Sequence, residues 1–168
     1  MKFFVALVVL TMSASSYAGA AIGIAELKNS KLTFDGLGPL RIGMTLKAVQ
    51  AAGIALEMDG DASNPCRTAR LKVNQEISLM FEKGILTLVE ISGPSISTHG
   101  GIRVGFTEAQ IREVYGSRVV VAPYDGGHYM KIFSLDGKRA LVFETYGAKV
   151  NNFRSGDLVD AQLSEGCS

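Results

Sequence analysis

The chain has 168 residues, with 17 Lys and Arg against 16 Asp and Glu, and 47% of its residues are hydrophobic. This length fits one or two small domains. The near-zero net charge argues against nucleic acid or an anionic membrane surface as the partner, because both require an excess of basic side chains.

The N-terminus has the pattern of a secretory signal peptide. Lys2 precedes an apolar run over residues 3–12, and small residues follow, with cleavage patterns ending at Ala18 or Ala20. The pattern predicts a signal peptide over residues 1–20. A transmembrane anchor is the alternative, and the apolar run is too short for one. We therefore expect a periplasmic or secreted protein with no membrane anchor.

The chain has two cysteines, Cys66 and Cys167. An even number of cysteines in an exported chain predicts a disulfide, whereas in a cytosolic protein it would suggest metal binding or catalysis. Two free thiols are the alternative. The predicted bond would close a loop of about 100 residues, which the chain-entropy model credits with about 4 to 5 kcal/mol.

Two blocks of sequence recur at the same separation. Residues 40–45 (LRIGMT) align with 102–107 (IRVGFT), and residues 79–82 (LMFE) align with 141–144 (LVFE). Matching blocks in register predict an internal duplication. We expect a first repeat with its lead-in over residues 21–94 and a second repeat with a tail over residues 95–168.

Each repeat contains a helix start. Thr45 and Thr107 are suitable N-caps, and Gln110 completes a capping box in the second copy. The pattern predicts short helices over residues 46–52 and 108–115. Helices of this length are marginal alone, so each must pack against other structure.

The segments after the helices alternate between apolar and polar residues, which is typical of half-buried strands. In the first copy we expect strands over residues 69–74, 77–81 and 85–91. In the second copy the pattern indicates strands near residues 129–133 and 141–143, with turns at 136–137 and 146–147. The fold class expected is α+β, a tandem duplication of one helix plus three antiparallel strands.

The doubled unit, with Ile42-Gly43-Met44-Thr45 and Val104-Gly105-Phe106-Thr107 at its helix starts, resembles the β-lactamase inhibitory protein fold. A single copy is similar to the unit of small envelope lipoproteins of the SmpA/OmlA type, and the whole chain is similar to uncharacterised exported proteins of the duplicated kind. The resemblance implies a binding or inhibitory role. The inhibitory protein carries a disulfide in each unit, whereas this chain has two cysteines in total.

The favoured binding segment is the loop containing Tyr124, Asp125, His128 and Tyr129. Tyrosine is a frequent interface anchor, and paired glycines let the backbone bulge. Its counterpart in the first copy is the acidic loop with Asp59 and Asp61, and both loops could share one rim of a duplicated sheet. The alternative is a plain hairpin connection with one tyrosine buried.

Other candidate chemistry has weaker support in the sequence. Residues 59–64 resemble the start of a calcium loop but lack the required Gly and Glu, so a polar loop is favoured and no metal or cofactor is expected. Glu82 and Glu144 occupy equivalent positions on a strand face that should contact water. His99 and His128 lack a nucleophile motif.

The function expected is that of a non-enzymatic exported protein that binds another envelope or extracellular protein, as an inhibitor or assembly factor. One alternative is a module that binds a small molecule or cell-wall fragment. The other is a hydrolase that uses His99 or His128. The sequence leaves the oligomeric state open.

Overall fold

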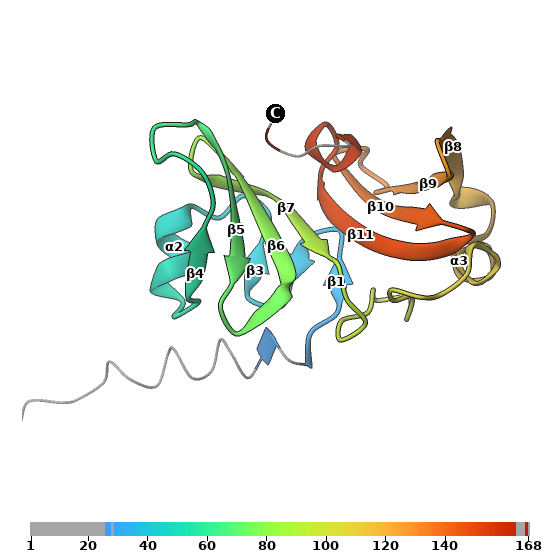
Figure 1. Cartoon of the computed structure of the whole chain (residues 1–168), viewed down its shortest axis with the longest axis horizontal. Helices are drawn as coiled ribbons and strands as arrows, with labels where there is room; N and C mark the ends of the chain where they lie inside the picture. Colours follow the sequence, from blue (N-terminus) through green and yellow to red (C-terminus); the bar gives the residue numbers. More distant parts are fainter. Residues whose placement is uncertain (1–25, 28, 164–166, 168) are drawn as a thin grey trace, which may run out of the picture.

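The computed structural model describes residues 26, 27, 29–163 and 167, and this part of the chain is dominated by one eight-stranded antiparallel sheet (Figure 1). Its strands are β4 (Leu56–Met58), β5 (Cys66–Leu71), β6 (Asn74–Glu82), β7 (Ile85–Ile91), β8 (Val120–Tyr124), β9 (Gly127–Phe133), β10 (Arg139–Tyr146) and β11 (Lys149–Asp157).

Smaller elements pack on this sheet. Three two-residue strands, β1 (Leu32–Thr33), β2 (Gly36–Leu37) and β3 (Leu40–Arg41), form a separate small sheet. Two helices described in full, α2 (Leu46–Ala51) and α3 (Glu108–Tyr115), lie at opposite sides of the molecule in Figure 1, and residues 26, 27 and 29 are also helical. Short 3-10 turns occupy η1 (Gly116–Arg118) and η2 (Asp160–Gln162).

The large sheet is continuous across both halves of the chain. Its strand order is β4-β5-β6-β7-β11-β10-β9-β8, so β7 and β11 pair at the centre and β4 and β8 form the two edges. The central pairing runs from Phe153 opposite Ile91 to Gly156 opposite Leu88. One sheet therefore spans the molecule, a point that the sequence left open.

The α+β fold-class prediction, a tandem unit of one helix plus three strands, is wrong. The α-helices contain six and eight residues, whereas eight strands form a single sheet, so the described fold is mostly β. The sequence patterns missed β4 and β8, which are short edge strands, and the small sheet of β1 to β3. Those elements bury surfaces that the predicted three-stranded units would have left open.

The predicted helix starts are confirmed. The hydroxyl of Thr45 accepts from the N–H of Ala48, and Thr107 forms a capping box with Gln110. Backbone pairing also fixes each start to the large sheet, because the N–H of Leu46 donates to Gly84 O and that of Glu108 donates to Ala148 O. The short helices are thus held by the hairpins that follow them.

The two faces of the sheet are covered differently. The face toward α2, α3 and the small sheet carries the main core, whose largest members are Phe81, Phe143 and Phe153. The opposite face, which we call the back face, has a smaller cluster of Met80, Leu88, Ala140, Val142 and Ala161. Part of the back face is therefore left for polar and aromatic side chains.

The predicted signal peptide, residues 1–20, lies outside the described residues. Among the residues that are described, no helix has the length and apolar character required to cross a bilayer.

Candidate functional site

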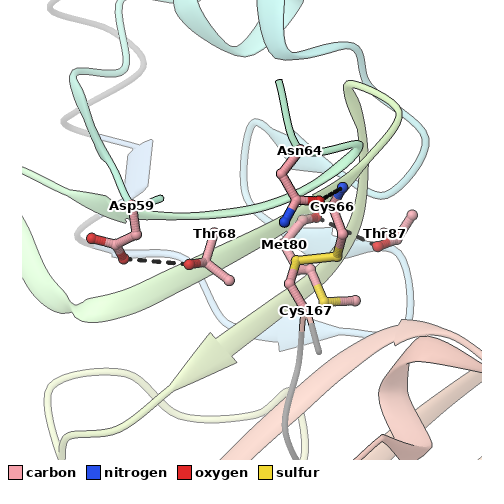
Figure 2. The surroundings of a disulfide bond; sticks show 7 residues. All are labelled: Asp59, Asn64, Cys66, Thr68, Met80, Thr87 and Cys167. Atoms are coloured by element: carbon pink, nitrogen blue, oxygen red, sulfur yellow. Dashed lines mark hydrogen bonds between the residues drawn. A yellow bond between two sulfur atoms is a disulfide. The ribbon is translucent and has the colours of Figure 1, made fainter. Parts of the chain in front are cut away.

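A disulfide ties the C-terminal segment to the first half of the sheet. Cys66, at the start of β5, is bonded to Cys167 with a Cα–Cα distance of 5.4 Å (Figure 2). Both cysteines pack against the back-face cluster, together with Leu158. The predicted pairing is confirmed, and it joins residues 101 positions apart.

Arg154 on β11 holds the same segment by polar contacts. Its side chain is 3% exposed, and its guanidinium donates to the carbonyls of Ala161 and Leu163, both at 2.9 Å. It also lies 3.3 Å from the Glu144 carboxylate and 3.7 Å from that of Glu90. Burial raises the pKa of Glu90, and the positive charge of Arg154 opposes that rise.

The predicted binding segment near Tyr124 is a tight hairpin. Tyr124 ends β8 and Gly127 begins β9, so Asp125 and Gly126 form the turn. Alternation along β9 then sends Tyr129 to the back face and His128 to the face that carries α3. The segment therefore contributes to two separate surfaces.

The predicted common rim with the Asp59 loop is wrong. That loop joins β4 to β5 at one edge of the sheet, whereas the Asp125 turn joins β8 to β9 at the other edge. Because successive neighbours from β5 to β9 are all antiparallel, the two connections also lie at opposite ends of their strands.

Three tyrosines gather on the back face at the β8 edge, and we call Tyr124, Tyr129 and Tyr146 the tyrosine patch. The rings of Tyr124 and Tyr129 lie 4.6 Å apart between centroids. Tyr146 is 67% exposed and its ring lies over Gly126. The patch presents aromatic faces and phenol groups next to an edge strand.

Charged groups surround the patch. The guanidinium of Arg154 lies 5.7 Å from the Tyr129 ring centroid, and Lys131 Nζ lies 6.0 Å from it. Burial raises the pKa of Tyr124, and the neighbouring Glu144 carboxylate adds to the rise. Tyr124 therefore remains a neutral phenol, which donates to Thr145 O at 2.7 Å.

His128 is held by Glu108 from the first turn of α3. Its Nδ1 lies 2.7 Å from Glu108 Oε1, and the Thr145 hydroxyl donates to the same oxygen at 2.7 Å. Thr145 is fully buried and its proton points to a carboxylate rather than to the imidazole. Because the hydroxyl donates to Glu108 and not to the His128 imidazole, the arrangement differs from a Ser-His-Asp triad, in which the histidine takes the proton of the nucleophile.

His99 lies apart from that pair, in the segment before α3. It is exposed, and its backbone N–H donates to Leu32 O at 2.9 Å, next to the small sheet. A hydrolase built on His99 or His128 stays an untested prediction.

The acidic loop after β4 is organised by its own polar groups. Asp61 accepts the N–H of Ser63 at 2.9 Å. Figure 2 shows the next contact, in which the side chain of Asn64 accepts the N–H of Cys66 at 2.9 Å. The hydrogen bonds from Ser63 lower the pKa of Asp61. Asp59 accepts the hydroxyl of Thr68 at 3.4 Å. Within the described residues, no three His, Cys, Asp or Glu side chains are close enough to hold a metal ion.

Several residues of these surfaces were missed by the sequence reasoning. Glu144, expected on a water-facing strand, is mostly buried against Arg154, whereas Glu82 at the end of β6 is half-buried. The local sequence around Arg154 does not predict which residues contact it, because its partners belong to other strands and to the segment after β11. The sequence placed Tyr146 only at a turn. Its position over Gly126 could not be predicted, because it depends on the pairing of β9 with β10.

Comparison with known proteins finds similar solved structures but assigns the chain to no family. No family model matches the chain, and no curated protein matches it. One similar solved structure is an uncharacterized protein, yfeY, from Escherichia coli, at 14% identity and a TM-score of 0.49, covering 75% of this chain and 99% of that one. Another is a DUF4309 family protein, YjgB, from Bacillus subtilis, at 17% identity and a TM-score of 0.47, covering 83% of this chain and 98% of that one.

A third solved structure is an extracellular protein containing a SCP domain, from Bacillus anthracis, at 9% identity and a TM-score of 0.42, covering 92% of this chain and 50% of that one. At these scores no statement about function follows from the three likenesses. They leave the resemblance to the β-lactamase inhibitory protein a prediction. The class that fold and site define is a mostly β, disulfide-linked protein with an aromatic surface patch.

Proposed function

We propose that this protein is a non-enzymatic binding protein, exported with cleavage near Ala18 or Ala20, and that the tyrosine patch contacts another envelope or extracellular protein. Export is supported by the disulfide between Cys66 and Cys167, because such bonds persist in oxidising compartments.

The observation that carries the binding role is the grouping of three tyrosine rings at the β8 edge of the sheet, with Arg154 and Lys131 near the ring of Tyr129. Tyrosine and arginine dominate the energetic centres of protein interfaces. Two of the three rings need little further ordering on binding, because Tyr124 is already hydrogen-bonded and Tyr129 already has two cations near its ring.

Photo-crosslinking in the envelope tests the proposal. A photoreactive phenylalanine replaces Tyr146 in the patch or, as the control, Val73 in the turn between β5 and β6, which is 48% exposed. We expect a discrete adduct from position 146 and none from position 73. Tyr129→Leu, which keeps apolar packing but removes the ring, should abolish the adduct.

A cell-wall fragment is the second candidate for the same surface, favoured by the exposed Tyr146 ring in a patch that also contains the Tyr129 ring with Arg154 and Lys131 near it. Digestion of the adduct separates the two: a protein partner is degraded by protease, and a wall fragment by a muramidase. An adduct that forms equally at position 73, or that persists in Tyr129→Leu, would remove the patch as the binding surface.

A further inference from the structure

A cavity of about 270 Å³ opens at the other edge of the sheet, far from the tyrosine patch along the strand order. It lies between the start of α2, the loop after β4, and the turn between β6 and β7. Its lining residues are Leu46, Met58, Ala62, Ser63, Asn64, Pro65, Arg67, Phe81, Lys83 and Gly84.

The lining divides into an apolar and a cationic part. Leu46, Met58 and Phe81 belong to or pack against the main core and supply an apolar wall. Arg67 and Lys83 supply two positive charges, and among the described residues no carboxylate lines this cavity. An apolar pocket with a few convergent polar groups is the usual form of a small-molecule site.

Arg67 lacks the partners that a half-buried guanidinium needs. Among the described residues it forms no ion pair, and its buried Nε has no hydrogen-bond partner. Arg67 also acts on the exposed Asp61 carboxylate, but the pKa of Asp61 is lowered first by the hydrogen bonds from Ser63 and only to a smaller degree by Arg67. An unsatisfied buried donor costs free energy, which an anion in the cavity would recover.

The cavity is pre-formed by backbone contacts. The N–H of Lys83 donates to Pro65 O at 2.6 Å, which joins the β6–β7 turn to the loop after β4. Lys83 itself has a φ of 50°, so the turn fixes the origin of its side chain. The same loop is held by the hydrogen bond that the backbone N–H of Cys66 donates to the side-chain oxygen of Asn64, next to the disulfide.

We infer that this cavity binds a small amphiphilic oxyanion. Its carboxylate or phosphate head lies between Arg67 and Lys83, and its short apolar chain lies against Leu46, Met58 and Phe81. Arg67 provides the planar donors that match an oxyanion, and Lys83 provides a second point charge. The site is independent of the tyrosine patch, so either can fail without the other.

Calorimetric titration of the purified, oxidised protein tests the inference, with sodium octanoate and monooctyl phosphate as probes. Octan-1-ol tests the chain without the charge, and inorganic phosphate tests the charge without the chain. We expect one octanoate or octyl phosphate per protein, with both controls at least tenfold weaker. The stronger of the two amphiphiles identifies the head group as carboxylate or phosphate.

Matched variants place the ligand. Arg67→Met and Lys83→Asn should each raise the dissociation constant at least tenfold, since both remove a charge. Asn tolerates the positive φ of position 83, so that variant keeps the turn and decides the question even if Arg67→Met folds poorly. Arg70→Met is the control, because Arg70 lies on the opposite face of the same strand and is exposed.

Three results would overturn the inference. One is the absence of binding by either amphiphile at millimolar concentration. Another is equal binding of octan-1-ol, which would show that charge plays no part. The third is unchanged affinity in both Arg67→Met and Lys83→Asn.

Discussion

The imidazole Nδ1 of His128 lies 2.7 Å from the Oε1 atom of Glu108, and this contact joins strand β9 to the first turn of α3. The same carboxylate oxygen accepts the hydroxyl of the buried Thr145 on β10. A helix of eight residues is marginal alone, so this polar connection contributes to holding α3 on the sheet.

The connection predicts acid sensitivity. Burial raises the pKa of Glu108, but the hydrogen bonds from Thr145 and His128 outweigh it, and the net pKa lies below its ordinary value of 4.5. The ionised carboxylate therefore stabilises the folded protein above pH 4.5, and this stabilisation is lost as the pH falls through the lowered pKa.

Urea denaturation of Glu108→Gln between about pH 3 and 7 tests this acid sensitivity, because the ionised carboxylate contributes stability only above its lowered pKa. We expect the variant to be less stable than the wild type at pH 7, with the difference shrinking toward pH 3. Glu113→Gln, at an exposed position of the same helix, should follow the wild-type curve. A constant difference across the range would contradict the role of the ionised Glu108.

Removal of the disulfide should destabilise the protein mainly through its unfolded state. The bond joins residues 101 positions apart, and the chain-entropy model gives a loss of about 4 to 5 kcal/mol for a loop of this size. The Cys66→Ala, Cys167→Ala double variant should show this loss in guanidinium unfolding. Hydrogen exchange should also quicken first in residues 158–163, which the bond and Arg154 hold on the back face. An unchanged exchange rate there would show that Arg154 suffices.

Arg154→Met should be among the most destabilising substitutions on the back face. It leaves Glu144 and Glu90 without their cation and the Ala161 and Leu163 carbonyls without a donor. Loss of one partner from a buried ion pair typically costs about 3 to 5 kcal/mol. The loss should shrink at acidic pH, where the carboxylate of Glu90, whose pKa is raised, becomes neutral.

Glu90→Gln is the matched control for that variant. Since the pKa of Glu90 is raised, its charged form is disfavoured in the folded protein, and the neutral amide should change the stability at pH 7 by less than about 0.5 kcal/mol. A loss as large as that of Arg154→Met would show that Glu90, rather than Glu144, is the essential partner. Chemical denaturation of the three proteins side by side gives the comparison.

The features that the sequence could predict depend on short-range chemistry. Thr45 and Thr107 begin the helices because a hydroxyl can cap the free N–H groups within three residues. The turn at Lys83 follows from the adjacent glycine, and both residues have positive φ. The disulfide followed from having two cysteines in an exported chain. None of these inferences requires knowledge of which strands are neighbours.

The missed features depend on long-range pairing. A continuous alternation concealed the turn between Leu71 and Asn74, so the first predicted strand ran on to residue 74, whereas β5 ends at Leu71 and β6 begins at Asn74. Strand β8 contains Pro123, which lowers its apparent strand character yet suits an edge, where a missing N–H is tolerated. The partners of Arg154 and His128 are set by the sheet order and by the packing of α3, which no local pattern encodes.

Gly127→Ala should disrupt the tyrosine patch by disturbing the hydrogen bond between Tyr124 and Thr145 O. A Cβ at this position would lie 1.7 Å from Thr145 O and 3.0 Å from the Tyr124 hydroxyl, so the hydrogen bond between them could not survive unchanged. We expect a loss of at least about 2 kcal/mol in unfolding free energy, because the overlap involves backbone that cannot move without breaking the β9–β10 pairing.

Gly137→Ala is the control: it sits in the next hairpin with a φ of 68° and nothing within 4 Å of its added Cβ. That variant should lose only the cost of a left-handed backbone, about 1 kcal/mol. Gly127 itself has no positive φ, so a loss in Gly127→Ala no larger than that in Gly137→Ala would show that the close approach of Thr145 does not make glycine necessary at position 127.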